Sequence, residues 1–469
     1  MSAREHGEPN QSEATKAAAS KVASPRESVG MRRRREHALR IAATLGPAPL
    51  IVGLDLASQS HVAWVRTAAQ QCIASFEVRH SLEGIEKLRH ELEPLVAEHG
   101  CERIVVGMEP TSHYWKNMFA AFEPTAMRCV LVSTVSVFHD RKAKHLRRAK
   151  GDRRDAEIIA GLVARGDFLR TTLETDPRAI RMRILADEHE DLVDLAGSER
   201  QRIRAGLGLV LPELLEVFDD PLGETSRALL RALGLPEPDS ALTQQRLLER
   251  LGSLVLRSRE GRRVYPSKVN ALAARLRCGP SFGVESHRAA TLGRIGRGVA
   301  RHEQLDRDRV EIAEKLVALY EELPFARFLD TIPHVGPLQH ALVVAYVGDP
   351  RRFDRASCLV SCAGTEPQEN QSGESAGPTL ISRAGPGRLR EIVYRIAMGL
   401  TLHSSHHRAV LERLRARALA YRQALVVIGN KYLRLLYRLA VEGKPFDVAR
   451  LEGHRVRSCR KTRTGAERK

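Results

Sequence analysis

Aromatic residues, paired cysteines and long apolar runs are scarce in this chain. Phe, Trp and Tyr make up 4% of the sequence, too few for stacking on aromatic platforms to be the main mode of nucleic-acid contact. None of the 7 cysteines belongs to a Cys-x-x-Cys pair, so a zinc ribbon is not indicated and reduced thiols are expected. No segment is apolar over the length of a membrane span, and the first residues lack the apolar core of a secretory signal. The chain is therefore expected to stay in the cytosol.

Motifs of acyl-transfer enzymes are missing as well: the sequence has neither a Ser-His-Asp order nor a Gly-x-Ser-x-Gly elbow. Cationic residues are in excess, with 75 Lys and Arg against 57 Asp and Glu, a formal net charge of +18 and a pI near 10.0. This balance favours a polyanionic partner, and a nucleic acid contacted at its phosphates is the first candidate. The length of 469 residues predicts two or three compact units.

An apolar run that contains one carboxylate opens the first expected unit. Leu50–Gln59 is typical of a buried strand, and Asp55 within it needs a partner, for which a metal ion is the economical choice. The apolar segments that follow predict an antiparallel meander, and then a helix capped by Ser81. That helix leads to a second apolar strand, which ends in Glu109. The strands of Asp55 and Glu109 are expected to lie side by side.

Two further acids follow a basic run. Asp152 and Asp155 are three residues apart, so on a helix they share one face, which is unfavourable unless a cation lies between them or solvent screens them. Two acids at strand positions and this pair together match the oxygen ligands of a two-metal phosphoryl-transfer site. The basic residues near the pair either contact nucleic acid or form a solvated face. They are Arg141, Lys142, Lys144, Arg147, Arg148, Lys150 and Arg153.

Helical periodicity dominates from about 177 to 324, with apolar stripes that favour ordinary helix packing or dimerisation. A stretch at about 234–290 has the composition of an insertion. Beyond it, the turn Pro333-His-Val-Gly-Pro337 opens a helix and resembles a helix-hairpin-helix turn. Backbone N–H groups of such a turn, here that of Gly336, can hold a phosphate.

Two polar groups of the last third have everyday explanations. Ser372 lies in a polar Ser-Gly loop, which by itself is typical of a turn. Three histidines at helical spacing have the residue type of metal ligands, but the neighbouring Arg408 favours a solvated face. They are His403, His406 and His407.

The order of these motifs resembles the DEDD-type insertion-sequence transposases, which are similar to the pilin gene-inverting recombinases and are understood as bridge-RNA-guided recombinases. The motifs extend over nearly everything between residues 50 and 445. Where the family has Ile-Ser-Lys-x-Gly-Asn, this chain has Arg383 for Lys and Pro386 for Asn, so the charge is kept. The matching motifs are Gly53-Leu-Asp55, Glu109-Pro-Thr, Asp152-x-x-Asp155-Ala, Ile332-Pro-x-Val-Gly336, Gly364-x-x-Pro367, Ser372-Gly373 and Ile381-Ser-x-x-Gly385.

The resemblance implies an α/β RuvC-like, or ribonuclease-H-like, domain over residues 47–170. It implies a helical or coiled-coil linker over 171–325 that pairs protomers, and a mainly α transposase domain with the helix-hairpin-helix-like turn over 326–450. Residues 1–46 are expected to be a disordered basic arm, and 451–469 a basic tail. In that family four acids bind Mg²⁺, and a serine attacks a DNA phosphate to give a phosphoserine intermediate. Carried over, the acids are Asp55, Glu109, Asp152 and Asp155, and the nucleophile is Ser372.

The resemblance also implies partners. The family assembles dimers into a tetramer that holds donor and target DNA, and it completes each active site with the acids of one subunit and the serine of another. A structured guide RNA specifies both DNA sequences, and the protein is cytoplasmic and nucleoid-associated. Arg383 and Arg388, which follow the serine loop, are expected to contact nucleic acid.

Two alternatives stay open. A RuvC-like nuclease would hydrolyse DNA junctions with water and use Ser372 only structurally. A basic nucleic-acid-binding protein would have kept the fold and lost the chemistry. The first alternative predicts that cutting survives replacement of Ser372, and the second predicts no strand breakage in Mg²⁺.

Overall fold

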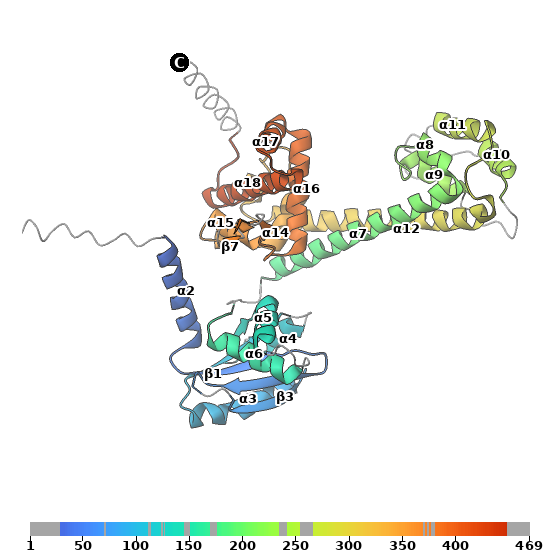
Figure 1. Ribbon diagram of the computed structural model, residues 1–469. Coiled ribbons are helices and arrows are strands. Elements are labelled where there is room, and N and C mark those ends of the chain that lie inside the picture. The colour runs from blue at the N-terminus through green and yellow to red at the C-terminus, as the bar shows by residue number, and fades with distance from the viewer. Residues whose placement is uncertain are drawn as a thin grey trace, which may run out of the picture. The chain divides into compact units, whose positions relative to one another are not determined.

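The chain forms two compact units, Met1–Leu173 and Glu174–Lys469. The computed structural model describes residues 29–69, 72–110, 114–122, 125, 127–144, 151–168, 176–233, 242–253, 266–368, 371–372, 375–376 and 380–447. The first unit is built around a β-sheet and the second mainly from helices (Figure 1). None of the described helices combines the length and the apolar character that a membrane crossing requires.

A five-stranded sheet forms the centre of the first unit, in the order β3-β2-β1-β4-β5. β1 pairs antiparallel with β2, which pairs antiparallel with β3, so the predicted meander is confirmed. β1 also pairs in parallel with β4, with Leu54 beside Met108, so the strands of Asp55 and Glu109 are neighbours as expected. The strands are β1 (Pro49–Asp55), β2 (Ser60–Arg66), β3 (Ala74–Arg79), β4 (Arg103–Met108) and β5 (Arg128–Leu131).

Alternating side chains of β1 divide the core of this unit into two layers. Leu50, Val52 and Leu54 belong to a buried cluster with residues of α3 and α4. Ile51 belongs to a second cluster, with residues of α5 and α6. Helices therefore cover both faces of the sheet, with α3 and α6 on opposite faces (Figure 1). They are α3 (Leu82–Glu98), α4 (Tyr114–Phe122), α5 (Thr134–Lys144) and α6 (Asp152–Ala164).

The structure confirms the predicted cap of the helix α3 and corrects the prediction for the segment before β1. The expected cap of α3 is confirmed, because the hydroxyl of Ser81 accepts a hydrogen bond from the amide of Gly84 at 3.1 Å. The expectation of an unstructured arm up to residue 46 is wrong for α2 (Val29–Leu45). Ile41 and Leu45 of this helix pack against the apolar cluster of α5 and α6. Residues 1–28 lie outside the described part.

The second unit is organised on two long helices, α7 (Pro177–Val210) and α12 (Arg288–Glu321), which lie side by side (Figure 1). At one end, the chain between them folds into a helical cap with its own apolar core. Among the described residues, the stretch predicted as an insertion supplies two α-helices and a short 3-10 helix of this cap. The fully buried Arg288 donates to the carbonyls of Val210 and Leu242 at 3.2 Å each. The cap contains α8 (Pro212–Val217), α9 (Glu224–Leu233), α10 (Gln244–Ser253), α11 (Pro266–Arg277) and η1 (Glu285–His287).

The remaining helices pack on the other end of α7 and α12 around a larger apolar core. Between α15 and α16 the chain forms short antiparallel pairs, β6 with β9 and β7 with β8. The helices are α13 (Ala326–Leu329), α14 (Pro337–Val347), η2 (Pro350–Arg352), α15 (Ala356–Cys362), α16 (Gly387–His403), α17 (Ser405–Ala416) and α18 (Tyr421–Glu442), and the strands are β6 (Pro367–Gln368), β7 (Gln371–Ser372), β8 (Ser375–Ala376) and β9 (Leu380–Ile381).

Candidate active site

Asp55 and Glu109 mark the carboxyl ends of the two central parallel strands. Asp55 is the last residue of β1, and Glu109 directly follows the last residue of β4. Because Leu54 pairs with Met108, the two acids occupy the next position of the same register, and both are half-buried. The alternation of β1 puts Asp55 on the side of Ile51, which faces α6. Carboxyl ends of parallel strands are where α/β sheets place their ligands.

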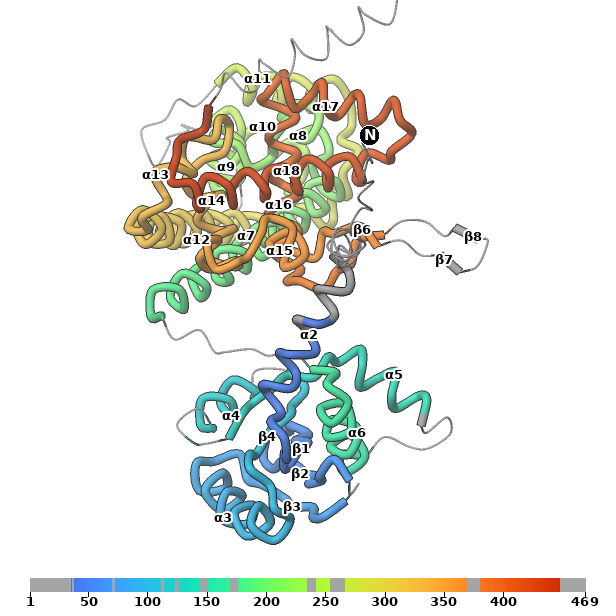
Figure 2. The backbone as a smooth tube through the Cα atoms, turned by 90° about the vertical axis from the view of Figure 1, so that its left-hand side faces the viewer, coloured from blue at the N-terminus to red at the C-terminus, as the bar shows by residue number. Residues whose placement is uncertain are grey.

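Helix α6 approaches this side of the sheet unusually closely, because two glycines lie beneath it. Gly53 and Gly107 pair with each other in adjacent strands. A Cβ atom at Gly53 would lie 2.1 Å from the carbonyl oxygen of Ala156, and one at Gly107 would lie 2.3 Å from a methyl of Val163. The backbone of α6 thus rests on β1 at Gly53, two residues before Asp55. Figure 2 shows α6 beside β1.

The Asp-x-x-Asp pair forms the first turn of α6, where carboxylates are favoured by the helix dipole. Asp155 is buried, with 2% of its surface exposed, and it adjoins Ala156, the residue in contact with Gly53. Its Oδ1 accepts a hydrogen bond from Nε of Arg141 on α5 at 2.7 Å. Asp152 is exposed. The sequence predicts a cation between these two acids. At Asp155, the cation that the structure shows is the guanidinium of Arg141.

The donor set suits a hard divalent cation, since it consists of carboxylate oxygens at strand ends and at one helix start. Among the described residues, however, no three His, Cys, Asp or Glu side chains lie close enough together to hold a metal ion as they stand. Asp155 is already neutralised by Arg141. The arrangement provides ligands on one side of the sheet, and a metal there would have to draw the acids closer together.

A pair of histidines behind the acids was not singled out from the sequence. His61 of β2 is fully buried, and its Nδ1 accepts the amide of Ala57, in the turn directly after β1, at 3.0 Å. Its Nε2 therefore carries the proton and donates to Nδ1 of His80 at 2.9 Å. On the far side of His80, Nε2 lies 3.4 Å from the side-chain amide of Asn117 on α4. This chain of contacts links the turn after Asp55 to the helix that follows Glu109.

Burial and the neighbouring His80 lower the pKa of His61 to about 4. A protonated ring would lose the hydrogen bond from Ala57, because Nδ1 would become a donor. The ring of His61 therefore stays neutral near pH 7. A polar residue at an inward position of an otherwise apolar strand is the sequence signal for such a group.

Ser372 lies in the second unit, in β7, where it pairs with Ser375 of β8. The base of this loop is fixed by the pairing of Pro367 with Ile381 in β6 and β9. Two glycines meet below it: a Cβ at Gly364 would lie 2.6 Å from the amide of Gly385. The motifs Gly364-x-x-Pro367 and Ile381-Ser-x-x-Gly385 thus come together as the base of the serine loop.

Arg383 has an uncommon backbone conformation at this base. Its φ of 54° lies in the left-handed region, which non-glycine residues rarely adopt. Its amide donates to the carbonyl of Gly364 at 3.0 Å, and its side chain is exposed. The loop geometry holds the basic side chain outward beside the serine loop.

Among the other residues expected to contact nucleic acid, some have exposed cationic groups and one is paired with an acid. Arg153 is exposed and lies over the ring of Trp64 at 5.3 Å, and Lys142 lies over Phe138 at 4.5 Å. Arg388 is instead bound to α7, through the carbonyl of Asp187 at 2.8 Å and the carboxylate of Asp191.

Two further expectations concern the backbone of the turn and the basic run. The amide of Gly336 donates to the side-chain oxygen of Gln339 at 3.0 Å, so it is occupied within its own helix start. Lys144 is the last residue of α5. Arg147, Arg148 and Lys150 lie outside the described residues, as does the basic tail 451–469.

Known proteins that are similar to this chain include transposases and a pilin gene-inverting protein. A family model for DEDD transposases of the IS110 type, described as a transposase, matches residues 52–212, and a model described as the transposase IS116/IS110/IS902 family matches residues 326–412. The putative mini-circle transposase for IS117 of Streptomyces coelicolor is 25% identical over 330 residues, which cover 68% of this chain and 77% of that protein. The pilin gene-inverting protein of Moraxella lacunata is 30% identical over 126 residues, which cover 26% of this chain and 38% of that protein.

Proposed function

Because the chain belongs to the IS110 family of transposases, we propose that it cuts and exchanges DNA strands by Mg²⁺-dependent phosphoryl transfer, with Ser372 as the nucleophile. It is a DNA transposase, so DNA is its substrate. The proposal assigns the metal to Asp55, Glu109, Asp152 and Asp155. It also takes the first unit to be a RuvC-like domain, which the strand order β3-β2-β1-β4-β5 supports.

The observation that carries the proposal is the meeting of acids at one edge of the sheet. Asp55 ends β1 and Glu109 directly follows β4, its parallel neighbour. Gly53, two residues before Asp55, lets the start of α6, with buried Asp155, pack against the same strand. Asp55 and Glu109 are half-buried and Asp155 is buried, and carboxylate oxygens at neighbouring strand ends and a helix start are the ligands that a hard divalent cation takes.

A bound divalent cation would lower the cost of the serine alkoxide and neutralise charge that builds up on the phosphate. The acids would orient it, and Arg141 would have to release or share Asp155. In the covalent step, a bond forms between Ser372 Oγ and phosphorus, and the bond between phosphorus and one deoxyribose oxygen breaks. The serine proton leaves to solvent or a base, and the released deoxyribose oxygen takes up a proton.

Rejoining reverses this step with a new partner. A deoxyribose hydroxyl of another strand attacks the phosphoserine, and Ser372 regains its proton. The phosphodiester bond energy is conserved in the covalent intermediate, so the exchange needs no ATP. We further propose that a structured guide RNA selects donor and target DNA, and that dimers assemble into a tetramer in which one subunit's acids act with another's serine.

The dimeric part of this proposal rests on exposed apolar side chains of α7 and α12. Ile184 and Leu195 of α7 are 60% and 55% exposed, and Val310 of α12 is 51% exposed. Such side chains on two long helices fit pairing with a second copy. Light scattering of the protein, alone and with nucleic acid, tests this point, and a monomer in both samples would refute it.

Mg²⁺-dependent cleavage of a DNA duplex carrying the element junction tests the assignment of the acids. Wild-type protein, with any RNA that co-purifies, is expected to cut in Mg²⁺ and not in EDTA. Asp55→Asn and Glu109→Gln keep the size of the side chain but remove a charged ligand, so both are expected to lose cutting while they keep the wild-type melting temperature. Equal cutting by Asp55→Asn and wild type would refute the metal site.

A hydrolytic nuclease is the second candidate, and the polar loop around Ser372 is compatible with it. It shares the acids and differs only in the nucleophile, which would be water. Cutting that persists in Ser372→Ala would favour it.

A further inference from the structure

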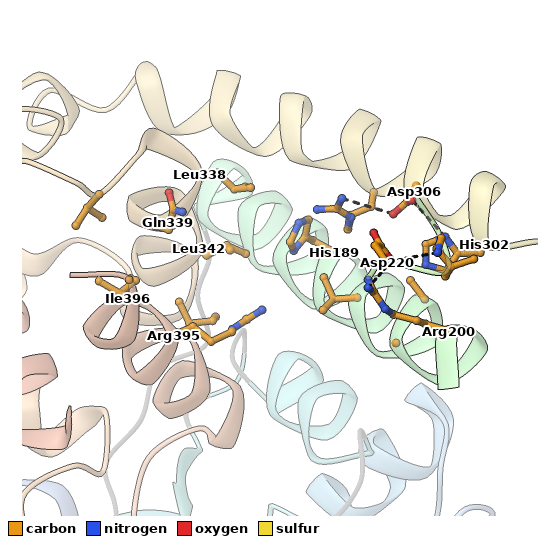
Figure 3. Close-up of a pocket in the computed structure, with 18 of the residues that line it drawn as sticks. His189, Arg200, Asp220, His302, Asp306, Leu338, Gln339, Leu342, Arg395 and Ile396 are labelled. Carbon is orange, nitrogen blue, oxygen red and sulfur yellow. Dashed lines mark hydrogen bonds and ion pairs between the residues drawn. The ribbon is translucent and has the colours of Figure 1, made fainter. Parts of the chain in front are cut away.

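Cationic side chains in the second unit fall into two classes, according to whether an acid neutralises them. A cavity of about 670 Å³, lined by residues of α7, α12, α14 and α16, illustrates the first class. In it Arg200 contacts Asp220 at 2.7 Å and His302 contacts Asp306 at 3.3 Å (Figure 3). Arg395 extends from α16 and pairs with Glu190. The four arginines that line this cavity each pair with an acid, whereas His334, which also lines it, forms no ion pair with a described residue. The arginines are Arg200, Arg227, Arg309 and Arg395.

The second class is a basic cluster formed by His334, His407, Arg413 and Lys431. His334 belongs to the turn before α14, His407 and Arg413 to α17, and Lys431 to α18. Burial, and then the charges of His406, Lys431 and His334, lower the pKa of His407 to about 4. Partial burial of its side chain, and then the charge of Arg413, lower the pKa of Lys431, although the residue as a whole is exposed. His407 therefore lies near His334 and Lys431, and Lys431 lies near Arg413.

No acid compensates this repulsion within the described residues. His334, Arg413 and Lys431 form no ion pair with any residue that the structure describes, although Arg413 Nε donates to the carbonyl of Ala409 at 3.2 Å. His407 Nδ1 lies 2.9 Å from the hydroxyl of Ser404, which is neutral. Arg413 and Lys431 are the permanent charges of the basic cluster, since His407 is neutral near pH 7. Two like charges without a counterion are unfavourable, and they become favourable when an external anion binds between them.

The exposed face of α18 extends the basic cluster into a stripe. Lys431, Arg434 and Arg438 are spaced at i, i+3 and i+7, so they share one face of the helix, and all three are exposed. At 1.5 Å per residue they span about 10 Å, which equals about three steps of 3.4 Å between successive phosphates of one strand, measured along the helix axis. Arg434 and Arg438 also lack an ion pair to any residue in the described part of the chain.

We propose that the basic cluster and the stripe Lys431-Arg434-Arg438 bind the phosphodiester backbone of a nucleic-acid strand, at a site separate from the acids of the first unit. The choice of a nucleic acid among anions rests on the proposed function. The source of the strand is DNA or the guide RNA, which present the same phosphates. His407, one of the three histidines predicted to form a solvated face, thus belongs to the proposed binding surface.

The test is a binding titration of the full chain in EDTA, with a labelled DNA duplex and a labelled RNA hairpin, over a series of salt concentrations. The variant is Lys431→Gln/Arg434→Gln/Arg438→Gln, whose positions are exposed, so the fold is kept. Lys315→Gln is the matched control: this exposed lysine lies on α12 and pairs with Glu311 at 2.5 Å. Melting curves verify that both proteins remain folded.

The triple variant is expected to bind at least one probe more weakly than Lys315→Gln does, and the loss should be largest at low salt. The slope of log affinity against log salt should fall by about 0.9 for each such phosphate of duplex DNA and by about 0.7 for each phosphate of a single strand. The probe whose binding weakens identifies the source. An affinity and slope equal to those of Lys315→Gln for both probes would overturn the proposal.

Metal-free binding separates this inference from the proposed function. If Mg²⁺-dependent cutting fails but the triple variant still loses salt-dependent binding, the phosphate site stands and the catalytic assignment falls. If cutting succeeds and the triple variant binds both probes as the control does, the catalytic assignment stands and the phosphate site falls.

Discussion

Gly53→Ala is the substitution that most directly probes how the acids are brought together. The added methyl group would lie 2.1 Å from the carbonyl oxygen of Ala156 and 2.4 Å from the amide nitrogen of Ala160. Both are backbone atoms of α6, so no side-chain rotation relieves the clash. Real Cβ atoms essentially never come closer than 3.0 Å to such atoms, so α6 has to retreat by about 1 Å, the difference between 3.0 and 2.1 Å.

The expected cost has a structural and a functional part. Overpacking of this kind lowers the free energy of unfolding by about 1–3 kcal/mol, or roughly 2–4 °C of melting temperature per kcal/mol for a unit of this size. The shift of α6 carries Asp155 away from Asp55, and a misplacement of about 1 Å costs about a hundredfold in rate. Urea unfolding and Mg²⁺-dependent strand cleavage measure the two effects.

The matched control is the same change at Gly197 on α7, where a Cβ would meet nothing within 4 Å. Helix propensity predicts that Gly197→Ala is neutral or stabilising by about 1 kcal/mol. Wild-type stability and cleavage in Gly53→Ala would refute the close packing of α6 on β1, and with it the geometry on which the acid site depends.

Three further expectations concern single side chains. Arg141→Gln removes the cation that competes for Asp155, so calorimetry should show Mg²⁺ binding that is several-fold tighter, by about 1 kcal/mol; weaker binding would show that Arg141 instead orients the acid. The pKa of His61 lies at about 4 against 6.5, so as pH falls from 6.5 to 4 the unfolded chain takes up its proton first, and the free energy of unfolding decreases over that window. In His61→Gln the free energy of unfolding in urea should decrease less over the same window, and an identical pH dependence would contradict the buried neutral ring. Arg288→Met leaves the carbonyls of Val210 and Leu242 without their donor, so unfolding should cost about 2–4 kcal/mol less, and unchanged urea midpoints would show that water replaces the donor.

The sheet and its acids were accessible from the sequence because their signals are local. Apolar runs with period two predict strands, and an acid at the end of such a run is visible as an exception. The crossover helix is equally local, with Ser81 in place to cap it. The parallel pairing of β1 and β4 then follows from the helix between them, so Asp55 and Glu109 are brought to one edge without any knowledge of tertiary contacts.

Features that depend on contacts distant in sequence were not accessible. The ion pair of Arg141 with Asp155 joins two helices, and the hydrogen bond from His61 to His80 joins β2 to the end of β3. Neither pair has a spacing that distinguishes it from other charged or polar residues. The helix α2 was missed for a different reason: its apolar side chains Ile41 and Leu45 gain their partners only from the folded unit.

In the serine loop, too, local features could be predicted from the sequence and contacts distant in sequence could not. The polar composition of the loop is readable, but the close approach of Gly364 to Gly385 that closes its base connects residues on either side of the loop. The identification of Ser372 as a nucleophile therefore comes from the family resemblance, and its chemistry stays a prediction.

Formation of a covalent adduct tests the central claim most directly. Protein with its co-purified RNA and Mg²⁺ is incubated with labelled DNA carrying the element junction, and denaturing gels separate protein-bound from free label. We predict an adduct in wild type and none in Ser372→Ala, with the label on the peptide that contains Ser372. Strand cutting without an adduct in both proteins would contradict serine recombination and identify a hydrolytic nuclease.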